Sequence, residues 1–143
     1  MKFNQQLTIS NDHAYLAQVR DLVSKGVTVG QFPGHYLNRL QIAVDEAVTN
    51  IIEHGYAGRP RGSGSIDITV EVNDVHFKII IVDHGLSFDP NQMSDIDIQS
   101  HVAAGKAGGL GVFLMRKIMD QVDYQYQVGK KNQLVLVKLR GKV

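Results

Sequence analysis

The stretch LNRLQIAVDEAVTNIIEHG, residues 37–55, decides the fold because it has the pattern of one long amphipathic helix. At about 100° per residue, its apolar residues fall on one side and predict a core-facing stripe of Leu37, Leu40, Val44, Val48 and Ile51. Glu46 and Asn50 are one helical turn apart and lie together on a polar flank. That flank borders Ala43 and Ala47, whose small side chains are expected to leave a shallow floor for a ligand. A solvated helix face has the same pattern, so a functional interpretation needs further motifs.

Composition narrows the classes to which the chain can belong. A length of 143 residues predicts a single domain, 1–143, with a substantial core. The net charge of +1 gives no reason to expect direct binding of nucleic acid or of an anionic membrane. The absence of cysteine excludes thiolate metal sites and fits a reducing compartment. The first residues, MKFNQQLTIS, lack a signal-peptide apolar region, and we therefore expect a cytoplasmic protein.

The rest of the chain predicts an alternation of strands and helices. A helix that carries residues 14–23 is expected to stop at Gly26, and Gly55–Gly64 reads as a loop. Runs with strand patterns cover residues 3–9, 65–72, 75–82, 123–128 and 133–139, and a last helix covers 111–119. This order predicts an α/β fold, a two-layer sandwich with helices on one face of a mixed or mostly antiparallel sheet. The run 75–82 ends in continuous apolar residues and should be the central strand.

The second chemistry-bearing motif is Asp83-His84-Gly85, followed by Phe88, at the end of this buried strand. A carboxylate at a strand end can accept a hydrogen bond from an exocyclic amine while apolar neighbours exclude water. Gly85 would let a backbone or a ligand approach closely. The alternative is an ordinary turn, in which Asp and Gly are common.

The third motif is the glycine-rich segment GKAGGLG, residues 105–111, which runs directly into a helix. Unpaired N–H groups and the helix dipole favour an anion at such a helix start. Lys106 adds a positive charge. The spacing fits neither a Walker A loop nor a Rossmann fingerprint, and the alternative is a flexible hinge.

Taken in order, the three motifs resemble a known family. EAVTN (46–50), DHGLSF (83–88) and GLGVFLM (109–115) are similar to the N-box, G1 box and G2 box of the GHKL, or Bergerat-fold, ATPases. Within that superfamily, the chain resembles most the anti-sigma-factor serine/threonine-protein kinases. The resemblance extends from the first strand to the last.

The resemblance implies the Bergerat ATP-binding fold, ATP and Mg²⁺ as cofactors, and a role for each motif. Asn50 would be the Mg²⁺ ligand, Glu46 the general base and Asp83 the residue that recognises adenine, with Gly85 beside it. ATP-binding positions also follow for a group that spans the lid and its flanks: Phe88, Lys106, Gly108, Gly109, Leu110 and Gly111. Of these, Gly109 and Gly111 would cradle the phosphates. Lys106 has no counterpart in the family's motif, and its positive charge is expected to neutralise charge on the phosphates. The segment from about residue 86 to 108 would be the ATP lid.

The resemblance also implies a function, with alternatives. The expected protein is an anti-sigma factor that phosphorylates a STAS-domain antagonist and sequesters either that antagonist or a sigma factor. The alternatives are a non-catalytic ATP/ADP switch, the ATP-binding part of a split histidine kinase, and a scaffold that binds no nucleotide. The second glycine of the chaperone-type G1 box is missing, with Ser87 and Phe88 there instead, as in the small kinases.

Two residues with weaker signals complete the predictions. Ile42 lies on the polar side of the long helix and marks either a single exposed apolar residue or a homodimer or partner surface. His54 continues the row of Glu46 and Asn50, and we expect it to face the carbonyl groups of its own helix end. The six histidines show no metal-ligand spacing, so zinc is not expected.

Overall fold

The computed structural model describes residues 2–85, 110–127 and 131–141. The elements follow one another as β1 (Phe3–Ser10), η1 (His13–Tyr15), α1 (Leu16–Val29), η2 (Gly34–Tyr36), α2 (Leu37–Asn50), η3 (Ile51–Gly55), β2 (Ser65–Val72), β3 (His76–Asp83), α4 (Leu110–Ile118), β4 (Gln121–Gln127) and β5 (Lys131–Leu139). The predicted order of strands and helices is confirmed. No helix within these ranges is both long and apolar enough to cross a bilayer.

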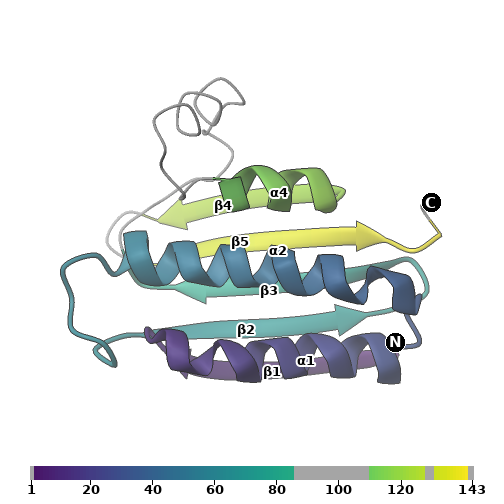
Figure 1. Cartoon of the computed structure of the whole chain (residues 1–143), viewed down its shortest axis with the longest axis horizontal. Helices are drawn as coiled ribbons and strands as arrows, with labels where there is room; N and C mark the ends of the chain where they lie inside the picture. The colour runs from purple at the N-terminus through teal and green to yellow at the C-terminus, as the bar shows by residue number, and fades with distance from the viewer. Residues whose placement is uncertain (1, 86–109, 128–130, 142–143) are drawn as a thin grey trace.

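The five strands form one sheet in the order β1-β2-β3-β5-β4. Each neighbouring pair is antiparallel, so the sheet in the described ranges is antiparallel throughout rather than mixed. As predicted, the strand with the continuous apolar run, β3, lies in the middle. The helices α1, α2 and α4 cover one face of the sheet, which confirms the two-layer α/β sandwich (Figure 1).

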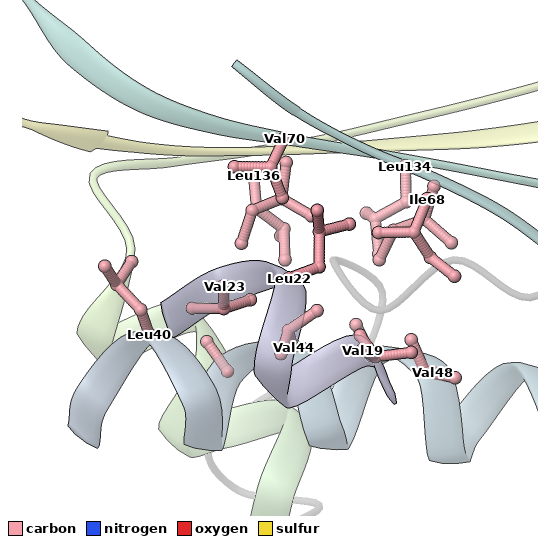
Figure 2. Close-up of a cluster of buried hydrophobic side chains, with 14 of the residues drawn as sticks. Val19, Leu22, Val23, Leu40, Val44, Val48, Ile68, Val70, Leu134 and Leu136 are labelled. Atoms are coloured by element: carbon pink, nitrogen blue, oxygen red, sulfur yellow. The ribbon is translucent and has the colours of Figure 1, made fainter. Parts of the chain in front are cut away.

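The core fills the space between the sheet and the helix layer. Strand residues that alternate along β2 and β5 point toward the helices, where apolar residues of α1 and α2 meet them (Figure 2). The predicted stripe of α2 is confirmed. Its middle members are fully buried, namely Leu40, Val44 and Val48, and its last member, Ile51, is 8% exposed. Burial of such side chains contributes about 1.5–3 kcal/mol each and fixes α2 on the sheet.

The long helix differs from its prediction in its last turn. The α-helix ends at Asn50, and Ile51–Gly55 form a π-helical turn, in which the N–H of Tyr56 donates to the carbonyl of Ile51 at 3.0 Å. Hydrophobic periodicity cannot distinguish an α-helical from a π-helical last turn, because one extra residue in a single turn shifts the apolar stripe only slightly. π-helical turns of this kind are frequent at functional sites.

Gly26 is not the stop of α1, which continues to Val29. A Cβ at position 26 would lie 2.9 Å from Val70 Cγ1 and 3.0 Å from the ring of Phe77. The glycine therefore serves close packing of the helix on the sheet, and the prediction of a helix end there was wrong. The cap residue of the observed end is Gly30.

Several strand boundaries also differ from the prediction, and β4 begins at Gln121 rather than at residue 123. β3 begins at His76 because the side chain of Asn73 accepts hydrogen bonds from the N–H groups of Val75 and His76, at 2.8 and 2.9 Å, which lengthens the turn by one residue. β5 begins at Lys131, so Asn132 is a strand residue rather than part of the last turn.

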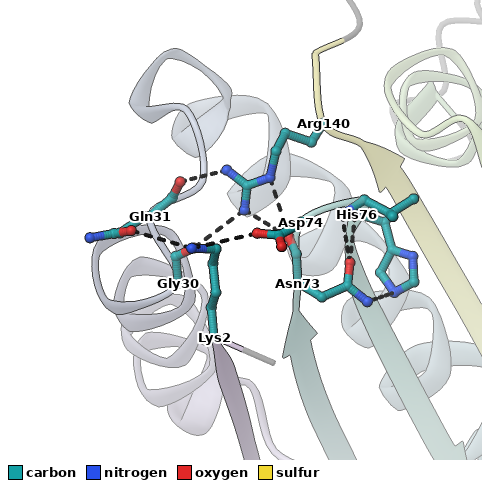
Figure 3. A network of polar contacts seen from close by, with 8 residues as sticks. Lys2, Gly30, Gln31, Asn73, Asp74, His76 and Arg140 are labelled. Atoms are coloured by element: carbon teal, nitrogen blue, oxygen red, sulfur yellow. Dashed lines mark hydrogen bonds and ion pairs between the residues drawn. The ribbon is translucent and has the colours of Figure 1, made fainter.

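Arg140 holds together the end of the molecule where β1 begins and β5 ends (Figure 1 and Figure 3). Its guanidinium donates to the main-chain carbonyls of Gln31 at 2.6 Å, Asn73 at 2.8 Å and Gly30 at 3.3 Å. It also lies 5.0 Å from the ring centroid of Phe32. One side chain thus joins the link between α1 and α2 to the turn between β2 and β3.

Candidate functional site

The polar flank of α2 carries Glu46 and Asn50 in half-buried positions, one turn apart. Burial raises the pKa of the Glu46 carboxyl, and the negative charges of Asp45 and Glu53 raise it further. A carboxylate with a raised pKa accepts a proton more readily than an exposed one. Both side chains are partly exposed and can therefore contact a ligand, and the raised pKa favours acceptance of a proton by Glu46.

The alanines beside this flank do not form the open floor that the sequence suggested. Ala43 is fully buried and Ala47 is 3% exposed, and both belong to the hydrophobic core. Their small size lets another element come close, and α2 packs against α4. His54 is exposed in the π-helical turn, and Ile42 is 39% exposed, as expected for the outer side of α2.

Asp83 is the last residue of β3 and is only 3% exposed. Its Oδ1 accepts hydrogen bonds from the N–H of Gly85 at 2.8 Å and from Nδ2 of Asn132 at 3.0 Å. Burial raises the pKa of the Asp83 carboxyl, while these two hydrogen bonds act in the opposite direction. Both hydrogen bonds from described residues reach Oδ1, which leaves Oδ2 as the atom able to accept a bond from a ligand.

Gly85 lies against the end of the helix that carries Asn50. A Cβ at position 85 would be 2.3 Å from the carbonyl oxygen of Gly55, a distance that no side chain tolerates. The predicted close approach at Gly85 is therefore an approach of backbone to backbone. This contact brings the end of β3 and the end of the long helix together.

Two residues of this region were missed by sequence reasoning. Nδ2 of Asn132 also donates to the carbonyl of Gly85 at 3.0 Å, so this 2% exposed amide ties Asp83 and Gly85 together. The hydroxyl of Tyr56 accepts a hydrogen bond from the N–H of His84 at 3.1 Å. Tyr56 follows a glycine at the start of a polar loop. Its aromatic side chain among polar residues was the one sequence feature that could have drawn attention to it.

The third motif is described only where it enters the helix. Leu110 and Gly111 are the first two residues of α4, which begins one residue earlier than predicted. Phe88, Lys106, Gly108 and Gly109 lie outside the described residues, as does the predicted lid. The described parts of the site are therefore the polar flank of α2, the end of β3 and the start of α4.

With this arrangement in hand, the chain can be compared with known proteins. The sequence model of a family described as the histidine kinase-like ATPase domain matches residues 9–138. The chain belongs to this family. The match covers the polar flank of α2, the end of β3 and α4, so the three motifs lie within the family domain.

Curated relatives of this family member are serine-protein kinases named RsbW. That of Bacillus pumilus is 36% identical over 95 residues, which make up 63% of this chain and 58% of the relative. Those of Staphylococcus aureus and Listeria monocytogenes are 36% and 33% identical, over 62% and 63% of this chain and 58% and 59% of the relatives. The matched segment thus spans less than two thirds of each of these relatives.

A solved structure shares the fold. The crystal structure of the RsbU and RsbW domains of a Mycobacterium tuberculosis protein superimposes with a TM-score of 0.64 over 99% of this chain and 34% of that chain. The sequences are 13% identical in this superposition, so the likeness is one of fold. It agrees with the α/β sandwich described above.

Proposed function

We propose that this chain is an ATP-dependent serine/threonine-protein kinase of the anti-sigma-factor type. The observation that carries the proposal is the junction of Gly55 with Gly85, which joins the helix of Glu46 and Asn50 to the buried carboxylate of Asp83. The similarity to serine-protein kinases over about 95 residues supports the same activity. The whole of 1–143 would act as one nucleotide-binding domain.

Asp83 is suited to recognise adenine. Its Oδ1 already accepts two hydrogen bonds, whereas Oδ2 accepts none from the described residues. A buried oxygen without a donor is costly, so a ligand that offers an N–H group there gains free energy. The exocyclic amine of adenine is such a donor, while guanine presents a carbonyl oxygen at the same position. Gly85 and, in the lid region, Phe88 would border the base.

Glu46 and Asn50 are suited to the transfer of a phosphoryl group. Mg²⁺ accepts neutral amide oxygens and takes several further ligands from phosphates and water, which fits a site with Asn50 as its protein ligand. When bound, the ion would neutralise charge on the phosphates. Glu46 would accept the proton of the attacking serine or threonine hydroxyl, a task that its raised pKa favours. Lys106, Gly108, Gly109, Leu110 and Gly111 would hold the phosphates.

The proposed acceptor is a serine or threonine of a STAS-domain antagonist, and the proposed second partner is a sigma factor. A homodimer is compatible with the exposed Ile42, which is 39% accessible on the outer side of α2. We place this activity in the cytoplasm, in accord with the lack of cysteine. Direct binding of nucleic acid or membrane forms no part of the proposal.

The test combines calorimetry with phosphoryl transfer. Titration with ATP, with and without Mg²⁺, should give a binding signal that Mg²⁺ strengthens, and labelled ATP should give acid-stable phosphate on the antagonist. Asn50→Ala should abolish transfer, and Glu46→Ala should retain nucleotide binding while transfer slows. Binding without transfer would indicate a non-catalytic switch, acid-labile phosphate a histidine kinase, and no binding a scaffold. Full activity of Asn50→Ala would refute the metal assignment.

A further inference from the structure

Tyr56 connects the end of the long helix to the strand end that carries Asp83. The side chain is buried, and its hydroxyl donates a hydrogen bond to the carbonyl of Ser65 at 2.8 Å. The same hydroxyl accepts a hydrogen bond from the N–H of His84 at 3.1 Å. His84 stands between Asp83 and Gly85, so the hydroxyl holds the middle of the motif that the proposed function assigns to the base.

The ring of Tyr56 is itself fixed on two sides. A Cβ at position 64 would lie 2.5 Å from Tyr56 Cε1, so the ring packs directly on the backbone of Gly64. The N–H of Gly64 donates to Oδ1 of the buried Asn11 at 3.0 Å, which anchors this backbone. The guanidinium of Arg59 lies 5.4 Å from the ring centroid. A ring held in this way keeps its hydroxyl at one point.

The three residues of the motif are each held by a different neighbour. Asn132 binds the carboxylate of Asp83, Tyr56 binds the N–H of His84, and the backbone of Gly55 abuts Gly85. Two of these three neighbours, Gly55 and Tyr56, are consecutive residues at the end of the π-helical turn that follows Asn50. The helix end therefore sets the place of the motif.

We propose that Tyr56 is a positioning residue for base recognition, which sets Asp83 at the correct distance from the helix that carries Asn50. The inference rests on the proposed nucleotide site. It implies that the hydroxyl of Tyr56 contributes to the recognition of adenine and not to the binding of the phosphates, which depends on α2 and α4.

The variant Tyr56→Phe tests this because it keeps the ring on Gly64 and removes only the hydroxyl. We expect the affinity for Mg²⁺-ATP to fall about 10-fold, equivalent to about 1.4 kcal/mol. The affinity for inorganic tripolyphosphate, which has no base, should change less than twofold. The preference for ATP over GTP should shrink by nearly the same factor as the ATP affinity, because the lost contact concerns the base. In hydrogen exchange, the amide of His84 should exchange at least about 10-fold faster than in the wild type, since a lost hydrogen bond opens this site locally.

The matched control is Tyr36→Phe. Tyr36 is another buried tyrosine, 2% exposed, whose hydroxyl forms no hydrogen bond with residues in the described ranges. It lies near Phe32, away from Asp83. This variant should leave both nucleotide affinities and the exchange of His84 unchanged.

Three outcomes overturn the inference. Equal losses of ATP and tripolyphosphate affinity would mean that Tyr56 only stabilises the fold, and unchanged ATP affinity with slow exchange at His84 would mean that its hydroxyl is dispensable. In both cases the wild type still binds ATP, and the proposed function stands. A wild-type protein that binds no ATP would overturn the proposed function and this inference together.

Discussion

The backbones of Gly55 and Gly85 touch, although 30 positions separate them in the sequence. A Cβ at position 85 would lie 2.3 Å from the carbonyl oxygen of Gly55, so no side chain fits at this position. Backbone atoms cannot turn aside as a flexible side chain can. The contact therefore fixes how the last strand residue, Asp83, is placed relative to the helix of Glu46 and Asn50.

Replacement of Gly85 by alanine should separate these two segments. Overpacking in rigid surroundings costs typically about 1–3 kcal/mol, and the displaced strand end should lower ATP affinity at least about 10-fold. Urea unfolding and calorimetric titration measure the two effects. Gly34→Ala is the control, because a Cβ at position 34 meets nothing within 4 Å. A Gly85→Ala protein that binds ATP normally would contradict the role given to this contact.

Asp83→Asn should abolish recognition of ATP without damage to the fold. The amide oxygen can take the place of Oδ1 and keep the hydrogen bonds from Gly85 and Asn132, which are 2.8 and 3.0 Å long. The amide nitrogen then replaces Oδ2. Its N–H groups would face the exocyclic amine of adenine, which is also a donor, so no hydrogen bond can form between them. We expect at least a 10-fold loss of ATP affinity in calorimetry and a normal thermal transition. Retained ATP affinity would show that Asp83 does not contact the base.

The stability difference between the wild type and Asp83→Asn should depend on pH. Burial raises the pKa of Asp83 in the folded state above its unfolded value, so the folded protein binds more protons between the two pKa values. The wild type should therefore lose stability relative to the variant as pH rises through that window, which begins near the ordinary aspartate pKa. Urea unfolding of both proteins at a series of pH values measures this difference. An opposite slope would mean that the pKa of Asp83 is lowered.

Glu53→Gln should move the pH profile of phosphoryl transfer. The pKa of Glu46 is raised by burial and also by the charges of Asp45 and Glu53, so the loss of one charge should lower it. A base acts when deprotonated, and the acid limb of the rate profile should accordingly shift to lower pH. The rate of transfer from labelled ATP across pH provides the measurement. Asp21→Asn, which removes one negative charge from α1 instead, is the control and should leave the limb in place.

Arg140→Ala should destabilise the far end of the molecule and leave the site intact. Its guanidinium donates to three main-chain carbonyls, and hydrogen bonds of a charged group are among the stronger ones, so we expect a loss of about 1–3 kcal/mol. Arg140→Lys should recover only part, since an ammonium group cannot span the three acceptors. ATP affinity should not change, because this end lies opposite the end of β3 (Figure 1). A parallel loss of ATP affinity would contradict that separation.

Much of the fold could be predicted because its signals are local and repeated. The apolar stripe of α2 and the continuous apolar run of β3 gave the core helix and the central strand correctly. Gly26 was misread because a glycine near the end of an apolar pattern resembles a helix stop, whereas its actual partners, Val70 and Phe77, are more than 40 residues away. Contacts of that range leave no trace in a local pattern.

For the candidate site, the sequence indicated only the residues that we propose to contact a ligand directly. Glu46, Asn50 and Asp83 carry functional groups in recognisable surroundings. Tyr56 and Asn132 act through main-chain N–H and C=O groups or through another side chain, so their significance depends on which strand ends meet. Asn132 lies between the two last predicted strands, and its importance follows from the pairing of β5 with β3, which sets it opposite Asp83.

The burial of Asp83 has a consequence for directed evolution of this protein. Burial disfavours the charged form of this carboxyl group, and the hydrogen bonds from Gly85 and Asn132 offset only part of that cost. In the proposed function, a bound adenine would offset more of it. A laboratory selection for heat resistance, carried out in the absence of nucleotide, would therefore tend to exchange position 83 for a neutral residue. Repeated recovery of such substitutions would show, without any activity assay, that the carboxyl group at position 83 lowers folding stability and is retained for ligand recognition.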